Sequence, residues 1–202
     1  MASFAAQERS ALHGIALPGR HGAGAGVAGL LIEERTDLSF ANVIAKRGKR
    51  DALVSAVETA YGVALPTRPR RVTKGSVTFA GTGPDQWIAS AEGPEAPNFA
   101  ARVRGRIGLF AAVSDQTDAR LVLRLSGPNV RDVLAKGVPL DLHPKVFKPG
   151  DVAITVVAYI GVELDRLDEA TFQLTAPRSM AGSFWSWLSA SAAEFGYDVV
   201  TR

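Results

Sequence analysis

Few side chains in this sequence have the types and spacing that catalysis requires. Three histidines are present, His13, His21 and His143, and there is no cysteine. Asp141 and His143 form a D-x-H pair, in which a carboxylate can orient an imidazole for base catalysis. No G-x-S-x-G or H-E-x-x-H motif supplies a nucleophile or metal ligands to act with this pair. We therefore interpret His143 as a loop residue whose hydrogen bonds hold its own segment together.

The carboxylates that could bind a metal ion gather at a predicted hairpin. They are Glu163, Asp165, Asp168 and Glu169. Charged side chains at a turn usually face solvent, and a metal site needs more oxygen ligands at tighter spacing. The lack of cysteine also excludes iron–sulfur clusters, Cys-based zinc sites and disulfides. We expect this chain to bind no metal.

A basic run at residues 68–74, RPRRVTK, is the strongest candidate for binding a polyanion. The strand order predicted below is one that RNA-recognition modules share, and those modules stack bases on aromatic side chains of central strands. The corresponding strands here offer only Trp87 and Phe172, with no K/R-G-F-x-F pattern. We expect no nucleic-acid partner.

The glycine-rich segment at residues 24–29 satisfies G-x-G-x-x-G. In a dinucleotide site these glycines follow a strand and open a helix, so that backbone amides face the pyrophosphate. Here they follow a loop and precede a strand-like run at residues 27–32, with no acidic residue about 20 positions later. The segment is better interpreted as a flexible hinge.

The composition is that of a folded protein. The chain has 202 residues, of which 47% are hydrophobic and 21% charged, and its net charge is +3. The N-terminus lacks a basic region followed by an apolar core, and no window approaches 18 apolar residues. We therefore expect no signal peptide and no membrane span, and a cytoplasmic location.

Residues 27–117 are predicted to form a first β-α-β-β-α-β unit. Strands are expected at 40–47, 76–80, 86–90 and 109–114. A helix at 50–61 places Leu53 and Val57 on one face, and Gly62 ends it in a left-handed conformation. A second helix begins near Pro97 and buries the face that carries Phe99 and Ile107.

Residues 118–202 are predicted to repeat this order. Strands are expected at 120–125, 152–159, 171–175 and 197–200, and helices at 128–136 and 180–195. Pro128 suits the first helical position and Gly137 the left-handed position at the helix end. Both units contain a glycine, an Arg-Asp step and a Leu/Pro exit, which indicates an internal duplication.

The fold class that follows is α+β, with two tandem split β-α-β units whose antiparallel sheets are covered by helices. Residues 1–26 are expected to form an extended N-terminal arm. A proline-rich crossover at residues 139–150 joins the first helix of the second unit to its next strand.

The C-terminal helix has one apolar stripe and one tryptophan outside it. The stripe comprises Met180, Phe184, Trp187, Leu188, Ser191 and Phe195. Trp185 lies off the centre of this stripe, where it either contacts another protein or covers the edge of the core. The sequence predicts a well-formed fold but few side chains suited to catalysis, and this combination favours a subunit that binds other proteins.

The second half of the chain resembles the gamma subunit family of bacterial heterotetrameric sarcosine oxidase. The matching segments run in order as S-G-P-x-x-R-D-V-L-A-K-G at 126–137, D-L-H-P at 141–144, F-x-P-G at 147–150, and P-R-S with W-x-W-L within 177–188. R-S-A-L at 9–12 and G-P-D-Q-W at 83–87 extend the resemblance over nearly the whole chain.

The resemblance implies a subunit of an enzyme that oxidatively demethylates sarcosine to glycine and produces hydrogen peroxide. With tetrahydrofolate the methyl carbon leaves as 5,10-methylenetetrahydrofolate, and otherwise as formaldehyde. The resemblance also implies a fold like the folate-binding aminomethyltransferases. It places FAD, FMN and NAD in the alpha and beta subunits and zinc in the delta subunit. We expect no catalytic residue and no bound cofactor in this chain.

The expected partners are therefore the alpha, beta and delta subunits. We expect subunit contacts in the arm, in the crossover and at the off-stripe tryptophan, namely at Arg9, Leu12, Ile15, Leu140, His143, Phe147 and Trp185. Two alternatives stay open. One is the equivalent subunit of another N-methyl amino acid oxidase or dehydrogenase, and the other is an independent folate- or RNA-binding module.

Overall fold

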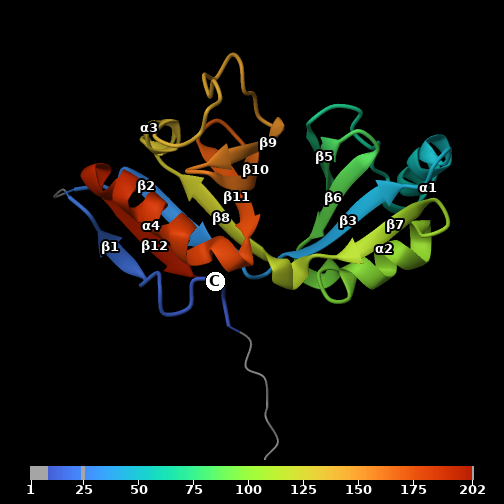
Figure 1. Cartoon of the computed structure of the whole chain (residues 1–202), viewed down its shortest axis with the longest axis horizontal. Helices are drawn as coiled ribbons and strands as arrows, with labels where there is room; N and C mark the ends of the chain where they lie inside the picture. Colours follow the sequence, from blue (N-terminus) through green and yellow to red (C-terminus); the bar gives the residue numbers. More distant parts are fainter. Residues whose placement is uncertain (1–8, 24–25, 202) are drawn as a thin grey trace, which may run out of the picture.

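The computed structural model describes residues 9–23 and 26–201, which form two sheets with helices on their outer faces (Figure 1). The first sheet has the strand order β4-β5-β6-β3-β7, and all its pairs are antiparallel. Its elements are β3 (Ser39–Ala45), α1 (Arg50–Tyr61), β4 (Arg71–Lys74), β5 (Val77–Gly83), β6 (Gln86–Ala91), α2 (Phe99–Ile107) and β7 (Ala111–Asp115).

The second sheet has the order β1-β12-β2-β8-β11-β10-β9. Its elements are β1 (Gly19–His21), β2 (Leu30–Glu34), β8 (Arg120–Ser126), α3 (Val130–Ala135), β9 (Val152–Val157), β10 (Ile160–Arg166), β11 (Thr171–Pro177), α4 (Ala181–Ala192) and β12 (Tyr197–Thr201). Four 3₁₀ turns complete the described part, at Gly93–Glu95, Thr117–Ala119, Arg178–Met180 and Ala193–Phe195.

The two units repeat one another, but each has one more strand than predicted. The observed order is β-α-β-β-β-α-β, because β4 in the first unit and β10 in the second were missed. The short β4 lies within the basic run, and β10 carries Glu163 and Asp165, two of the four carboxylates that were assigned to a turn. The predicted α+β class is nevertheless confirmed.

The strand β2 belongs to the second sheet, although the predicted first unit began at residue 27. It pairs in parallel with β12 and antiparallel with β8. In the first sheet the strands that correspond to β8 and β12 are β3 and β7, and these two pair directly with each other. The sheets therefore divide the chain after β2 rather than before it.

Left-handed helix ends were predicted at Gly62 and at Gly137, and the two predictions have different outcomes. Gly62 adopts φ 64° and donates its N–H to the carbonyl of Glu58, as predicted for a helix end. Gly137 was predicted to adopt the same left-handed conformation, and this is wrong because α3 ends at Ala135 and Gly137 is not among the positive-φ residues. A Cβ on Gly137 would lie 2.7 Å from the Trp187 ring, so close packing explains this glycine.

The described part of the N-terminal arm lies on the second sheet. Leu12 and Ala16 are buried in its core, and β1 pairs with β12. Glu34 fixes this segment by accepting the backbone N–H of Leu12 at 3.1 Å. The hinge predicted at residues 24–29 falls partly on residues 24 and 25, which lie outside the described ranges.

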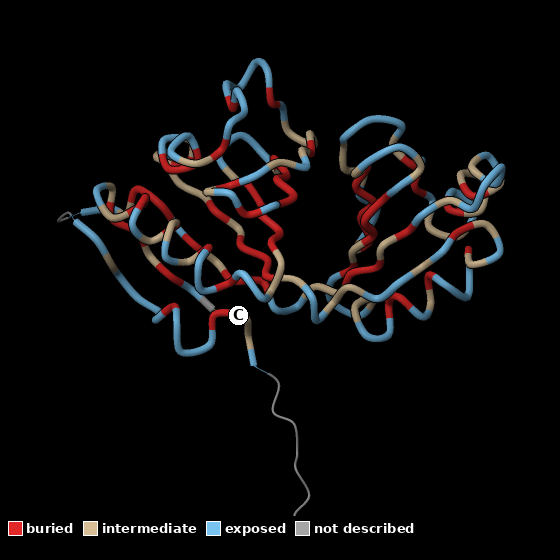
Figure 2. The backbone as a smooth tube through the Cα atoms, in the orientation of Figure 1, coloured by how far each residue is buried: buried red, intermediate tan, exposed pale blue. Residues whose placement is uncertain are grey.

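Each sheet turns one face to its own helices and the other toward the opposite sheet (Figure 1). Buried positions follow the strands along this junction (Figure 2). A small apolar cluster of Phe40, Ile88 and Val122 packs there between the units. No helix in the described ranges has the length and hydropathy to cross a membrane.

Candidate functional site

The helix-free faces of the two sheets meet along a set of buried polar side chains, which we call the polar seam. On β10 the core takes Val162 and Leu164, so strand alternation turns Glu163 and Asp165 toward the opposite sheet. The seam comprises the buried Thr78, Glu163, Asp165, Gln173 and Thr175 and the half-buried Arg71 and Arg120. Glu163 and Asp165 were expected to face solvent at a turn, and this is wrong because they lie within a strand.

Burial dominates the electrostatics of the two seam carboxyls. Burial raises the pKa of Asp165 to about 6, although the Arg71 guanidinium acts in the opposite direction. Burial also raises the pKa of Glu163 well above its usual range, and Asp165 raises it further. The Arg71 Nη1 atom lies 3.6 Å from Asp165 Oδ2. With exposed fractions of 6% and 3%, Glu163 and Asp165 are positioned to join the sheets rather than to meet a substrate.

The basic run contributes to this junction. Arg70 pairs with Asp151 at 3.0 Å, and the two residues form an isolated antiparallel bridge between the units. Arg71 pairs with Asp165 as described above. Two of the arginines that suggested a polyanion surface therefore hold one sheet to the other.

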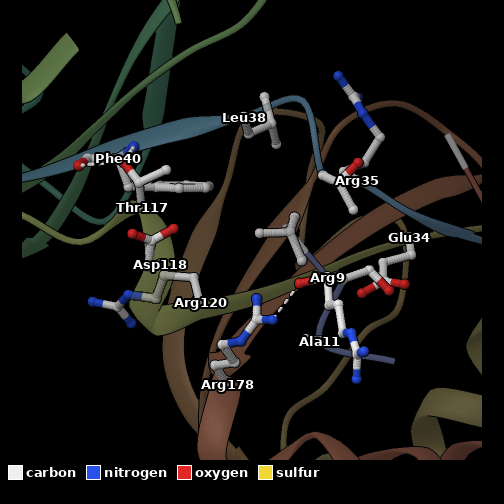
Figure 3. Close-up of a pocket in the computed structure, with 13 residues that line it drawn as sticks. Arg9, Ala11, Glu34, Arg35, Leu38, Phe40, Thr117, Asp118, Arg120 and Arg178 are labelled. Carbon is white, nitrogen blue, oxygen red and sulfur yellow. Dashed lines mark hydrogen bonds between the residues drawn. The ribbon is translucent and has the colours of Figure 1, made fainter. Parts of the chain in front are cut away.

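A pocket of about 640 Å³ lies where the two linkers between the sheets run side by side (Figure 3). Four chain segments line it, and its residues are Arg9, Ser10, Ala11, Glu34, Arg35, Thr36, Leu38, Phe40, Thr117, Asp118, Arg120, Val122 and Arg178. Arg178 points into this space and donates to the carbonyl of Arg9. Most of its lining residues are polar or charged, and Leu38, Phe40 and Val122 are its large apolar side chains.

One arginine of the pocket is fully neutralised by residues outside it. Arg35 donates to both carboxylate oxygens of Asp37, at 2.7 and 2.8 Å, and to Glu92 at 2.6 Å. These bonds, above all those with Asp37, raise the pKa of Arg35. Because Glu92 follows β6 of the first sheet, Arg35 ties the linker to the opposite unit.

The crossover at residues 139–150 is held to the second sheet by Arg166. This side chain is fully buried and donates to the carbonyls of Pro144, Phe147 and Asp168, and to Glu169. Arg166 was not among the residues predicted from the sequence. The available signal was its place as the last residue of β10, where strand alternation directs it to the same face as the core residues Val162 and Leu164.

The residues predicted to contact other subunits do not share one environment. Leu12 and Phe147 are buried in the core of this chain, and Phe147 stacks on Phe172 with ring centroids 6.4 Å apart. These two side chains therefore lie beneath the surface of the chain rather than on it. Trp185 is half-buried, packs against the core and meets the Tyr197 ring edge-on at 6.2 Å.

The other predicted contact residues are exposed. They are Arg9, Ile15, Leu140 and His143. The His143 amide donates to Asp141 at 2.8 Å, and its ring accepts the Lys145 amide at 3.2 Å. His143 therefore makes the local hydrogen bonds expected of a loop residue. Within the ranges that the structure describes, no group of three metal-ligating side chains comes together.

Comparison with known proteins decides the family. A model of the sarcosine oxidase gamma subunit family matches residues 47–194. The chain belongs to this family. As a sarcosine oxidase gamma subunit it is a subunit of an oxidoreductase, and its predicted resemblance is confirmed.

Curated relatives agree with the family model. The gamma subunit of sarcosine oxidase from Corynebacterium sp. strain P-1 is 33% identical over 150 residues, which cover 72% of each chain. The Arthrobacter sp. gamma subunit is 31% identical over 171 residues, which cover 81% of this chain and 82% of the relative.

Solved structures agree as well. A chain of the heterotetrameric sarcosine oxidase from Corynebacterium sp. U-96 superposes with a TM-score of 0.79 and 27% identity, over 93% of this gamma subunit and 96% of that chain. The aminomethyltransferase T of the glycine cleavage system from Bartonella henselae shares the fold, with a TM-score of 0.64 and 15% identity over 86% of this chain and 48% of that one.

Proposed function

We propose that this gamma subunit binds and braces the flavin-bearing alpha and beta subunits of a cytoplasmic heterotetrameric sarcosine oxidase, and that it performs no chemical step itself. The complex would demethylate sarcosine to glycine and form hydrogen peroxide, with 5,10-methylenetetrahydrofolate or formaldehyde as the one-carbon product. FAD, FMN and NAD would lie in the alpha and beta subunits and zinc in the delta subunit. Family membership and the structural match to a heterotetramer support this proposal.

The observation that carries the bracing role is an exposed apolar surface on the second unit, which we call the crossover–hairpin surface. It comprises Leu140, Val146, Ile154, Val156 and Tyr159, with exposed fractions between 39% and 101%. The crossover and the β9–β10 hairpin are consecutive along the chain, and exposed large apolar side chains at a sheet edge are typical of protein interaction sites. Leu140 and Val146 lie in the crossover, which was predicted to contact partners, whereas β9 and its hairpin were not among the predicted contact segments.

The backbone of β9 adds hydrogen-bonding capacity to this surface. β9 is the last strand of its sheet, so one of its sides has no neighbouring strand. At its start the Val152 amide donates outward to the carbonyl of Pro69 at 3.3 Å. Because backbone groups alternate sides along a strand, the amides of Ile154 and Val156 also point outward. A partner strand or loop could pair with them.

Tyr159 is placed at the tip of this surface by a strained turn. Its side chain is 101% exposed, and Ala158 and Tyr159 both adopt positive φ, at 47° and 69°. Residues other than glycine adopt this conformation at a cost of about 1 kcal/mol or more. Strain of this kind is found where structure serves recognition, and tyrosine is frequent among the residues that dominate binding energy.

Co-expression of all four subunits tests the proposal. Tyr159→Ser combined with Ile154→Ser should reduce co-purification of this chain with the flavin-containing subunits by at least tenfold, because both side chains leave the crossover–hairpin surface. Leu109→Ser is the matched control, since Leu109 is 80% exposed on the first unit between α2 and β7. The proposal fails if the double variant assembles normally, or if Leu109→Ser is the change that releases the complex.

A further inference from the structure

Arginines outnumber acidic residues in the lining of the pocket between the linkers. Four arginines and two acidic residues line it. Arg35 is paired with Asp37 and Glu92, neither of which lines the pocket. In the described part of the chain, Arg9, Arg120 and Arg178 form no ion pair with a carboxylate within 4.0 Å.

The Arg178 guanidinium is the best placed of these three. It reaches into the space from one side, toward Leu38 and Phe40 on the other (Figure 3). Among the described residues it makes one hydrogen bond, from Nη2 to the carbonyl of Arg9, and its other donors have no partner there. Nearby, Arg120 has a buried Nε atom without a hydrogen-bond partner.

Two further observations favour a small-molecule ligand. The volume of about 640 Å³ lies within the range of roughly 300–1,000 Å³ of small-molecule sites. The apolar part of the lining is formed by Leu38, Phe40 and Val122, and the last two pack in the cluster that joins the sheets. A ligand there would combine a negatively charged group with an apolar body.

We propose that this pocket binds a small organic carboxylate, whose charged group is held by Arg178 and Arg120 and whose apolar body packs on Leu38, Phe40 and Val122. Guanidinium groups bind carboxylates with two parallel hydrogen bonds, which gives both strength and orientation. Because both linkers and the N-terminal segment line the pocket, an occupied pocket fixes the two units together. Binding to the folded state then raises the melting temperature.

Calorimetric titration and thermal melting of the full chain and of the assembled complex test this, with benzoate as the probe and benzamide as its uncharged counterpart. Benzoate should bind saturably and raise the melting temperature, and benzamide should do neither. Arg178→Gln should weaken benzoate binding at least tenfold. Arg104→Gln is the control, because Arg104 is exposed on α2 and donates only to the Val113 carbonyl.

Arg178 also holds the Arg9 carbonyl, so its loss could disturb the N-terminal segment. Arg120→Gln provides the second test, since the Arg120 side chain makes no hydrogen bond in the described part of the chain. It too should weaken benzoate binding at least tenfold. Because Arg120 also faces the buried Glu163 of the polar seam, the melting temperature of the free variant is measured as well, so that a loss of affinity is separated from a loss of stability.

Three results would overturn the proposal. The first is no saturable benzoate binding, or equal binding of benzamide. The second is unchanged affinity in both the Arg178 and Arg120 variants. The third is benzoate binding to the chain alone that disappears in the assembled complex, which would assign the pocket to an acidic side chain of a partner subunit.

Discussion

At the scale of single residues, the seam carboxyls Glu163 and Asp165 are acidic groups whose pKa values this fold raises strongly. Their pKa values are raised chiefly because burial disfavours the ionised form. Arg71 and Arg120 oppose this effect without removing it. Since the pKa of Asp165 is raised in the folded state to about 6, the folded chain holds a proton that the unfolded chain releases near pH 4.

The stability of the chain should therefore fall as pH rises from about 4 to about 6, because the folded state then binds more protons than the unfolded state. Asp165→Asn removes the contribution of this residue. Relative to the wild type, its free energy of unfolding should increase by on the order of 2 kcal/mol between pH 4 and pH 7. Urea titrations across this range measure the change.

Asp51→Asn on the exposed side of α1 serves as the control and should show no comparable trend. A constant stability difference between Asp165→Asn and the wild type across the pH range would contradict the account of the seam.

The sequence pattern did not place Glu163 and Asp165 on a buried strand face, because the residues around them have the composition of a turn. The run from Glu163 to Glu169 has the composition of a solvated turn, and only the alternation with Val162 and Leu164 indicates a strand. A buried polar face also requires a second sheet to cover it. Single-sequence periodicity contains no information about that tertiary contact.

At the scale of elements, the hairpin of β9 and β10 combines local strain with exposure. A type I′ hairpin turn requires positive φ at both central positions, which Asn-Gly adopts readily and which Ala158 and Tyr159 adopt here only at a steric cost. The sequence therefore gave no turn signal at Ala158 and Tyr159, and β9 was predicted to run through them to residue 159. The helices, by contrast, were predicted from apolar spacing, and α1 has the predicted bounds.

Relieving the backbone strain at Ala158 or at Tyr159 should raise the stability in both cases but weaken assembly in only one. Ala158→Gly and Tyr159→Gly should each stabilise the chain by about 0.5–1 kcal/mol, because glycine adopts positive φ without steric cost. Only Tyr159→Gly should weaken co-purification with the partner subunits, since it alone removes an exposed aromatic side chain. Thermal melting and co-purification of both variants test this, and equal loss of assembly in the two would contradict it.

At the scale of the whole molecule, two similar units are locked together by charged contacts at several points. Arg35 joins the linker to Glu92, Arg70 reaches Asp151, and the polar seam fills the space between the sheets. The duplication was visible in the sequence. The assignment of β2 to the second sheet could not be predicted from the sequence. β2 precedes the first unit in the chain, and its pairing with strands of the second unit is a long-range contact that exists only in the folded structure.

Arg35→Met should lower the free energy of unfolding by about 2–3 kcal/mol, because a buried guanidinium and its charge-assisted hydrogen bonds are lost. Its partners Asp37 and Glu92 are partly exposed, so they remain solvated in the variant. Arg104→Met on exposed α2 should change the stability by less than about 0.5 kcal/mol. Chemical denaturation of both variants measures the difference, and equal stabilities would contradict this role of Arg35.

The central claim is that the crossover–hairpin surface joins this gamma subunit to the rest of its complex. Hydrogen–deuterium exchange of the full chain, alone and in the assembled complex, tests it most directly. The outward amides of Ile154 and Val156, with the peptides that cover residues 138–160, should become protected on assembly. Unchanged exchange over residues 138–160, with protection confined to other parts of the chain, would contradict the claim.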